Sequence, residues 1–255
     1  MILIIFGSKS DERIYTPLLD GIREKEIEYD LFIASAHKSP GYVEDILDDV
    51  DKKYKLIIAG AGLAAHLPGV IASKTIRPVI GIPIDVNFSG MDSLLSIIQM
   101  PPSVPVLSVG IDEYNESVKN STLILKKYDK VNILHKNLFP EGKLKKVLGI
   151  FSDFNIKFEY NTIVKVDCIN INPVELGHDV DILENCISVN IPVSSESNMD
   201  DLKKLSDMTK IGLWVGLNRF DNAAISAIQL LNFDDEYSKK LIKFKKNLEE
   251  SFRNA

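Results

Sequence analysis

The sequence predicts an α/β protein in which a parallel sheet is covered by helices on both faces, a three-layer αβα sandwich. Short apolar runs alternate along the chain with segments of helical periodicity, and most of these runs end in glycine, proline or small polar residues. Strands buried on both faces of a parallel sheet have this continuous apolar character. Their regular alternation with helices is typical of right-handed βαβ units.

Five strands are predicted in the first half, with helices between them. An apolar helical pattern follows the first strand at Ile14, Leu18, Leu19 and Ile22, and a helix rich in leucine and isoleucine is predicted over residues 91–100. We expect these elements to adopt a flavodoxin-like Rossmann topology. The predicted strands are residues 2–6, 27–33, 54–59, 78–84 and 104–111.

Composition and charge exclude several classes of protein. The chain has 255 residues, 45% of them hydrophobic, and a formal net charge of −6. Binding to a nucleic-acid backbone needs a basic surface, so no nucleic-acid partner is expected. No apolar run approaches the roughly 20 residues that span a bilayer. The apolar start of the chain lacks the basic region of a signal peptide, so we expect a cytoplasmic protein.

The segment at residues 60–69, GAGLAAHLPG, is the first candidate for a functional site. It follows a buried strand that we expect to end at Gly60, and its small residues are followed by one imidazole, His66. Small side chains allow a ligand to lie against the backbone, and ligands bind outside the carboxyl ends of parallel strands. A structural alternative is that the glycines only permit a tight turn with close packing.

Polar residues also follow the first two strands. Ser8, Ser10 and Asp11 come after the first strand, where they either contact a ligand or cap the next helix. Ser35, His37 and Lys38 follow the second strand, just before a helix that starts at Pro40. An imidazole transfers protons near neutral pH, and an adjacent cation can hold a phosphate. The ends of three strands therefore predict a single anion-binding site.

The second half of the sequence resembles the first. Residues 147–160 (VLGIFSDFNIKFEY) match residues 18–31 (LLDGIREKEIEYDL) without a gap, at a displacement of 129 positions. Later matches are displaced by 109, 108 and 106 positions, at Ile191, Met199 and Val215. We interpret the chain as a tandem duplication whose second copy has lost about twenty residues. A chance likeness between two βαβ segments is the alternative. The division predicts a catalytic domain at 1–128 and a structural repeat at 129–255.

Polar loop residues of the first half are missing from the second. HKNLF at 135–139 stands where the first half has GSKSD, and nothing matches the Gly60 loop. We therefore expect one active and one structural half. His135 and His178 have no motif around them and are interpreted as ordinary residues. Cys168 and Cys186 are expected to be small buried hydrophobes, and the basic stretch 239–246 a solvated helix face.

Taken together, these motifs resemble the PurE family of purine-biosynthesis enzymes. The resemblance covers residues 1 to about 128 and rests on GSKSD (7–11), SAHKSP (35–40), residues 60–69, residues 78–83 and residues 91–101. Members are N5-carboxyaminoimidazole ribonucleotide mutases and aminoimidazole ribonucleotide carboxylases. The second half is then a degenerate copy, and residues 216–249 are similar to the last helices of the family.

This resemblance implies a rearrangement without cofactor or metal, in which a carboxylate moves from the exocyclic nitrogen to C4 of an aminoimidazole ribonucleotide. His37 would be the general acid and base, with His66 beside it as a second catalytic residue. Ser8, Ser10 and Asp11 would hold ribose and phosphate, and Ser35, Ala36 and Lys38 would bind the phosphate region. The base and CO2 would be enclosed by Ala61, Gly62, Ala65, His66 and Leu67.

One residue departs from the expected pattern. Members of the mutase branch usually have arginine after the catalytic histidine, whereas this chain has Lys38. A direct carboxylase that uses CO2 is therefore an alternative to the mutase, and a ribonucleotide-binding protein without activity is another. By analogy with octamers of the family, we expect a homo-oligomer, a tetramer of duplicated chains. Its partners would be a small ribonucleotide and CO2, without nucleic acid or membrane.

Overall fold

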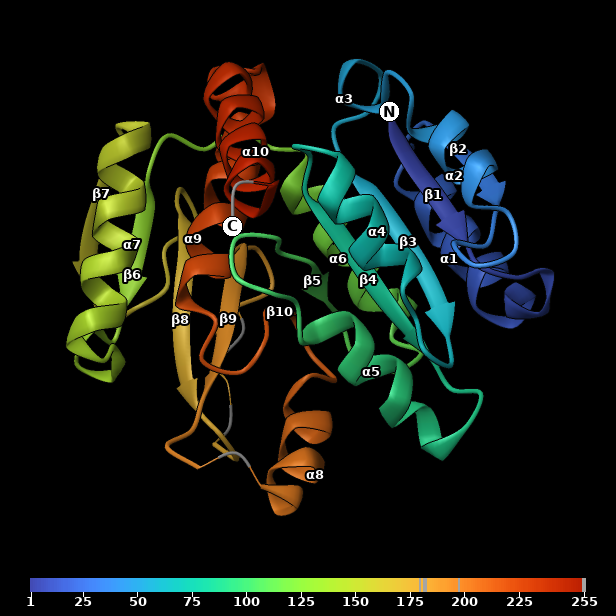
Figure 1. The fold of residues 1–255 in the computed structure, drawn as a ribbon. Helices are drawn as coiled ribbons and strands as arrows, with labels where there is room; N and C mark the ends of the chain where they lie inside the picture. The colour runs from blue at the N-terminus through green and yellow to red at the C-terminus, as the bar shows by residue number, and fades with distance from the viewer. Residues whose placement is uncertain (179, 181–182, 197, 254–255) are drawn as a thin grey trace.

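A single mostly parallel sheet forms the centre of the molecule (Figure 1). The computed structural model describes residues 1–178, 180, 183–196 and 198–253. Within these residues the sheet has ten strands in the order β2-β1-β3-β4-β5-β10-β9-β8-β6-β7. Every neighbouring pair is parallel except β5 and β10, which are antiparallel. The predicted αβα sandwich is confirmed, and both halves of the chain contribute to the same sheet.

The strands are short and deeply buried near the middle of the sheet. In β1, Ile2, Ile4 and Phe6 pack on one face of the sheet and Leu3 and Ile5 on the other, as the two-residue period of a strand requires. The strands are β1 (Ile2–Phe6), β2 (Tyr29–Ile33), β3 (Ile57–Gly62), β4 (Val79–Ile84), β5 (Leu107–Ser108), β6 (Val131–Leu134), β7 (Phe158–Asn161), β8 (Ile169–Glu175), β9 (Ser188–Val193) and β10 (Leu213–Trp214).

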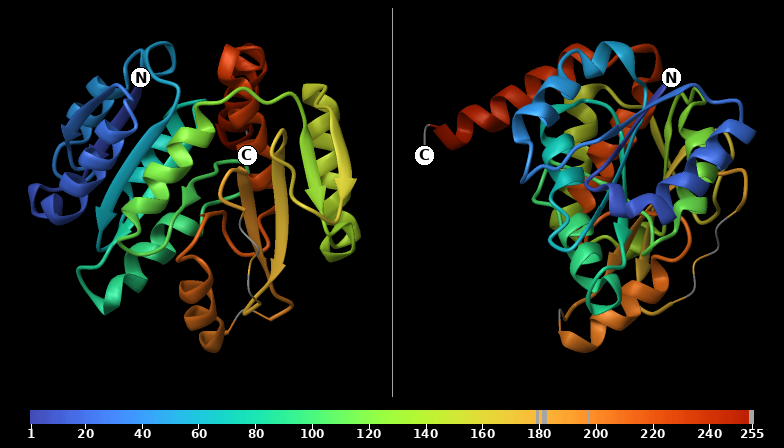
Figure 2. Two further views of the ribbon diagram at one scale, coloured as in Figure 1. Left: turned by 180° about the vertical axis from the view of Figure 1, so that it is seen from behind. Right: turned by 90° about the vertical axis from the view of Figure 1, so that its right-hand side faces the viewer.

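Helices cover both faces of this sheet (Figure 2). Helices α1, α6, α7 and α9 share one core with the sheet, and α2 and α4 belong to a second core on the opposite face. The helices are α1 (Glu12–Glu24), α2 (Pro40–Leu47), α3 (Val50–Lys53), α4 (Leu67–Lys74), α5 (Met91–Ile98), α6 (Tyr114–Ile124), α7 (Glu141–Phe154), α8 (Met199–Met208), α9 (Phe220–Leu231) and α10 (Ser238–Arg253). Short 3-10 helices are η1 (Lys9–Asp11), η2 (Phe88–Gly90), η3 (Lys136–Leu138) and η4 (Asn232–Asp234).

The two halves have the same strand order and register. The order β2-β1-β3-β4-β5 of the first half corresponds to β7-β6-β8-β9-β10 of the second. Ile2 pairs with Tyr29, and Val131 pairs with Phe158, each 129 positions later. A 3-10 helix follows the first strand of each half, at η1 and η3. This agreement supports the predicted duplication with a boundary near residue 128, which we retain as a proposal.

Two strand predictions differ from the structure. Strand β3 continues to Gly62 instead of ending at Gly60, because Gly60 pairs with Ile82 and Gly62 with Ile84 on the neighbouring strand β4. The fifth strand, expected over residues 104–111, comprises only Leu107 and Ser108. Pro105 precedes it and has no N–H to donate to a neighbouring strand. Strand β5 joins the two halves of the sheet, since Ser108 pairs with Trp214 of β10.

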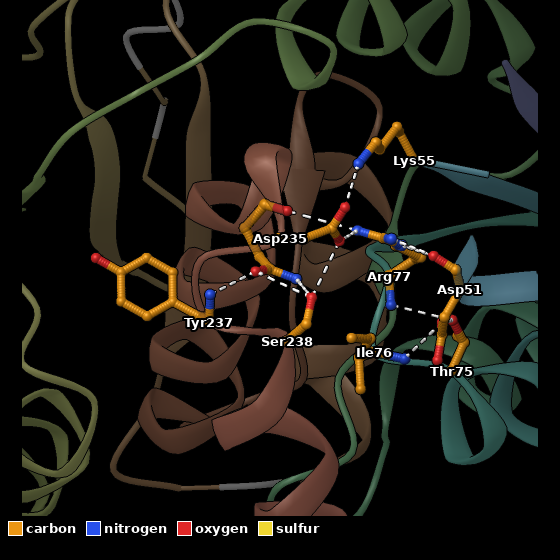
Figure 3. A network of polar contacts seen from close by, with 9 residues as sticks. Asp51, Lys55, Thr75, Ile76, Arg77, Asp235, Tyr237 and Ser238 are labelled. Carbon is orange, nitrogen blue, oxygen red and sulfur yellow. Dashed lines mark hydrogen bonds and ion pairs between the residues drawn. The ribbon is translucent and has the colours of Figure 1, made fainter. Parts of the chain in front are cut away.

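A polar network joins the first half to the turn before α10 (Figure 3). The Arg77 side chain is 4% exposed, and its Nη1 lies 2.6 Å from Asp235 Oδ1. Lys55 Nζ lies 2.7 Å from the other oxygen of Asp235. Arg77 Nε also donates to the Asp51 carbonyl at 3.0 Å. Burial alone would raise the pKa of Asp235, but hydrogen bonds from Lys55, Arg77 and Ser238 outweigh it and lower that pKa to about 2.

One smaller expectation is confirmed, and another is corrected in part. Cys168 and Cys186 are free and buried, and burial raises the pKa of Cys168 to about 12. The basic stretch lies on α10, whose side chains are mostly exposed. Lys245 is the exception, because it donates to the Ala72 carbonyl and burial lowers its pKa to about 8. Among the described helices, none has the length and apolar character needed to cross a membrane.

Candidate active site

All twelve residues predicted for the site line one cavity of about 420 Å³ in the first half. It lies where β1, β2 and β3 end, so three neighbouring strands deliver its walls. The predicted residues in its lining are Ser8, Ser10, Asp11, Ser35, Ala36, His37, Lys38, Ala61, Gly62, Ala65, His66 and Leu67. Their proximity follows from the parallel order of the strands, and their chemical roles stay predictions.

The first wall is the turn that follows β1. Ser8 Oγ accepts hydrogen bonds from Ser10 N at 3.2 Å and Ser10 Oγ at 2.7 Å, so Ser8 caps η1. Neither Ser10 nor Asp11 forms a side-chain cap on α1. Asp11 is 5% exposed, and burial raises its pKa, although hydrogen bonds to Ser10 and Ser8 oppose the shift. The hydroxyls of Ser8 and Ser10 remain exposed beside this carboxyl group.

The second wall is the loop after β2, which hydrogen bonds hold in a closed turn. Ser35 Oγ accepts from Lys38 N at 3.2 Å, and Ser39 Oγ accepts from Ser35 N at 3.1 Å. Ser39 N also donates to the Ser35 carbonyl at 2.9 Å. These bonds fix the backbone from which the exposed His37 and Lys38 project. Among the described residues, no carboxylate lies within ion-pair distance of Lys38, so its charge is available to an anion.

The third wall is the glycine-rich end of β3. A Cβ atom at Gly60 would lie 2.2 Å from the Phe6 ring, so this glycine is required for packing within the sheet. A Cβ atom at Gly62 would lie 2.4 Å from Val86, whose side chain lines the cavity. The structural alternative, in which a glycine only permits close packing, therefore applies to Gly60. Gly62, in contrast, lies at the cavity wall. Beyond β3, Ala65 and Leu67 are buried and His66 is exposed.

Two histidines from different loops meet across the cavity. His37 Nε2 lies 2.7 Å from His66 Nδ1, and the rings are nearly perpendicular at 83°. One of these two nitrogens must carry a hydrogen for the bond to form, and the other must accept it. The pair therefore shares one proton between the facing nitrogens. Such a pair can pass a proton between a bound molecule and solvent, which is the function expected of a general acid and base.

Four lining residues were not predicted from the sequence: Gly7, Leu63, Ala64 and Val86. The first three lie within or beside the predicted motifs. Val86 follows β4 and has no motif, so no sequence signal identified it. Arg13 holds the chain that follows β4 in place, just before Val86. It donates to the Asp85 carbonyl at 2.7 Å and forms an ion pair with Asp112 at 2.6 Å. The fourth strand thus also contributes to the cavity.

The remaining histidines lie elsewhere. His135 and His178 line a different cavity in the second half of the chain. Within the described part of the chain, no three His, Cys, Asp or Glu side chains converge as a metal site would require. The expectation of a reaction without metal or cofactor therefore stays a prediction.

Comparison with known proteins places the first half in one family. The sequence profile of the AIR carboxylase family matches residues 1–133. The N5-carboxyaminoimidazole ribonucleotide mutase of Methanocaldococcus jannaschii is 44% identical over 146 residues, which are 57% of this chain and 91% of that protein. The enzyme of the same name from Pyrococcus abyssi is 43% identical over 123 residues, 48% of this chain and 68% of the other.

Solved structures give a weaker match. The crystal structure of Treponema denticola PurE aligns with a TM-score of 0.43 and 22% identity, and the alignment covers 59% of this chain and 96% of the other. The family assignment rests on the sequence matches, which include all twelve predicted site residues within positions 1–133. On these grounds the chain belongs to the AIR carboxylase family.

Proposed function

We propose that this protein is an enzyme of purine biosynthesis that interconverts N5-carboxyaminoimidazole ribonucleotide and 4-carboxy-5-aminoimidazole ribonucleotide. The observation that carries the proposal is the His37–His66 hydrogen bond of 2.7 Å inside a cavity that also contains Lys38. Relatives 43–44% identical to this chain have the mutase name. The cavity combines a proton-transferring pair, a cation and exposed hydroxyls, as a reaction on a ribonucleotide requires.

The proposed reaction balances without an added reagent. The bond between the exocyclic nitrogen and its carboxylate breaks to release CO2, and the nitrogen receives a proton. C4 of the imidazole then attacks the CO2, and the proton on C4 is removed. His37 donates the first proton and accepts the second, so it ends the cycle in its starting state. His66 is hydrogen-bonded to His37 and would stabilise the protonation state required at each step.

The phosphate of the substrate would bind at the second wall. The ammonium group of Lys38 supplies a positive charge, and the hydroxyl of Ser35 supplies a hydrogen-bond donor. Trapped CO2 would need a small enclosure, and Ala61, Gly62 and Ala65 leave room for it without bulky side chains. The buried carboxyl of Asp11 would accept hydrogen bonds from ribose hydroxyls.

Direct carboxylation of aminoimidazole ribonucleotide by CO2 is the second candidate, and Lys38 is the residue that favours it. The two reactions are separated by one assay with purified protein and either substrate. A mutase converts the N5-carboxylated substrate without ATP or bicarbonate. Conversion of aminoimidazole ribonucleotide and CO2 alone would instead identify a carboxylase. Absence of turnover with both substrates would refute the enzymatic proposal, and binding of the ribonucleotide without turnover would identify a ribonucleotide-binding protein.

We also propose that the chain assembles into a tetramer that resembles an octamer of single-domain chains. Apolar side chains are exposed beside the cavity, with Leu63 at 48%, Val86 at 52% and Phe88 at 81%. A neighbouring chain that covered them would also help to retain CO2 in the cavity. Light scattering tests this proposal: a mass near four chains is expected, and a monomer would contradict it.

A further inference from the structure

A second cavity, of about 900 Å³, lies in the second half of the chain. It is formed where β6, β7 and β8 end, which correspond in sheet order to β1, β2 and β3 around the first cavity. The strand register supports the same correspondence, because Gly62 pairs with the last residue of β4 and Glu175 pairs with the last residue of β9. Ligands of α/β sheets bind outside the carboxyl ends of strands, and this cavity lies there.

The second cavity is unsuited to phosphate. Among its described lining residues none is Lys or Arg, whereas the first cavity contains Lys38. Strand β8 ends in Pro173, Val174 and Glu175, in place of the small residues that end β3. A carboxylate without a facing cation repels a phosphate group. An anionic ligand is therefore disfavoured in this cavity.

The second cavity contains an amide oxygen that accepts no hydrogen bond from the described residues. Asn172 is 6% exposed and lines the cavity, and its Nδ2 donates to Asn190 Oδ1 at 3.0 Å. Within the described residues, nothing donates to Asn172 Oδ1. Asn172 Oδ1 is not fully buried, so it is accessible from the cavity and can accept a hydrogen bond from an N–H group of a ligand. At the rim, Glu175 Oε2 is a second acceptor, 3.7 Å from His178 Nδ1.

The walls of the second cavity are largely apolar. Leu138, Ile163 and Val174 line it together with the imidazole of His135. Ile163 is 68% exposed, so its side chain is accessible to a ligand in the cavity. Apolar walls with a few acceptors are suited to an aromatic ring that presents N–H groups at its edge.

We propose that the second cavity binds an uncharged aromatic heterocycle with N–H donors, a compound of the nucleobase or nucleoside class, and discriminates against its phosphorylated form. The second half then has a binding function of its own, in place of the purely structural role expected from its lost motifs. This proposal does not depend on the reaction proposed for the first half.

Isothermal titration of the full chain with adenosine tests the proposal, because adenosine has an amino group and no charge. Saturable binding at one site per chain is expected, and the exposed position of Ile163 makes Ile163→Arg compatible with folding. This substitution should weaken binding at least about tenfold, since it places a charged side chain on the apolar wall. Ile242→Arg on α10 is the matched control, because Ile242 is 54% exposed and lies outside this cavity.

Titration with AMP provides the second arm. At the site that Ile163→Arg disrupts, AMP should bind at least about tenfold more weakly than adenosine. His37→Asn should leave adenosine binding unchanged, because His37 lies in the first cavity. Absence of adenosine binding, binding insensitive to Ile163→Arg, or AMP binding as tight as that of adenosine at this site would each overturn the proposal.

Discussion

The two halves of this chain have one strand order but different chemistry at the same edge of the sheet. In the first half the strands end in serines, small residues and a histidine pair, and the cavity has about 420 Å³. In the second half they end in apolar residues, an amide and a carboxylate, and the cavity has about 900 Å³. The comparison teaches that two halves can share one strand order and register while the loops beyond the strands differ in chemistry.

The strongest test of this difference is the removal of the proton-transferring group. We expect His37→Asn to lower kcat by at least about 100-fold, because an amide cannot accept and return a proton at neutral pH. His37 is exposed, so the thermal midpoint should hardly change. The rate of N5-carboxyaminoimidazole ribonucleotide conversion measures the effect. Lys243→Ala on α10 is the control, and an active His37→Asn protein would refute the proposed role.

The next test concerns Lys38, the positive charge that lines the first cavity and has no counterpart among the described lining residues of the second. Lys38→Met should raise KM about tenfold or more with a smaller change in kcat, because a charge-assisted contact to phosphate contributes about 1.5–3 kcal/mol. Steady-state kinetics at two salt concentrations measures it. Lys9→Met is the matched control, since Lys9 is an exposed lysine near the first turn and does not line the cavity. Equal KM values for both variants would argue against phosphate binding by Lys38.

The polar network around Arg77 tests how firmly the C-terminal region is attached to the first half. The folded-state pKa of Asp235 is about 2, below its ordinary value of 3.8. Its contribution to stability is therefore present above about pH 4 and is lost as the pH falls through about 2. Asp235→Asn should lower the free energy of unfolding by about 1 kcal/mol at pH 7, a modest effect because Asp235 is 46% exposed.

Urea unfolding of this variant and the parent protein at pH 7 and near pH 2.5 would measure the change. The two proteins should differ less at the lower pH. Glu236→Gln removes a neighbouring exposed carboxylate and is the control. A difference between variant and parent that does not depend on pH would contradict the ionic origin of the effect.

Helices α1 and α7, which correspond in the two halves, both contain glycine, and we expect opposite effects of alanine at Gly21 of α1 and Gly149 of α7. A Cβ at Gly21 of α1 would lie 2.9 Å from Val118, whereas a Cβ at Gly149 of α7 would meet no atom within 4 Å. Gly149→Ala should stabilise the protein by about 0.5–1 kcal/mol through helix propensity, and Gly21→Ala should destabilise it. Thermal unfolding measures both. Stabilisation by both substitutions would show that α1 packs no more tightly than α7.

Much of the first-half site could be predicted because its signals are local. Each predicted residue lies within a few positions of a strand end, and parallel strands bring such positions together. The extent of β3 was wrong because glycine propensity suggested an end at Gly60, whereas pairing with β4 extends the strand to Gly62. Val86 was missed because its role depends on the distance between β3 and β4, which no local pattern reports.

The arrangement of the halves was also beyond the sequence patterns. Periodicity predicts two similar units. Ser108 of one unit pairs with Trp214 of the other, and this pairing depends on how the edge strands of both units fit together. His135 and His178 were interpreted as ordinary because no motif surrounds them, yet the fold brings them to the same cavity. Side chains far apart in sequence and without a shared motif can be assigned to a site only from the folded chain.

The most direct test of the account is the number of sites for 4-carboxy-5-aminoimidazole ribonucleotide on each chain. Calorimetric titration of the parent protein should give one site per chain, and Lys38→Glu should abolish binding by placing a negative charge at the proposed phosphate position. Lys9→Glu is the control for the change of net charge. Two equivalent sites per chain, or binding that persists in Lys38→Glu, would contradict the proposal that only the first half binds the ribonucleotide.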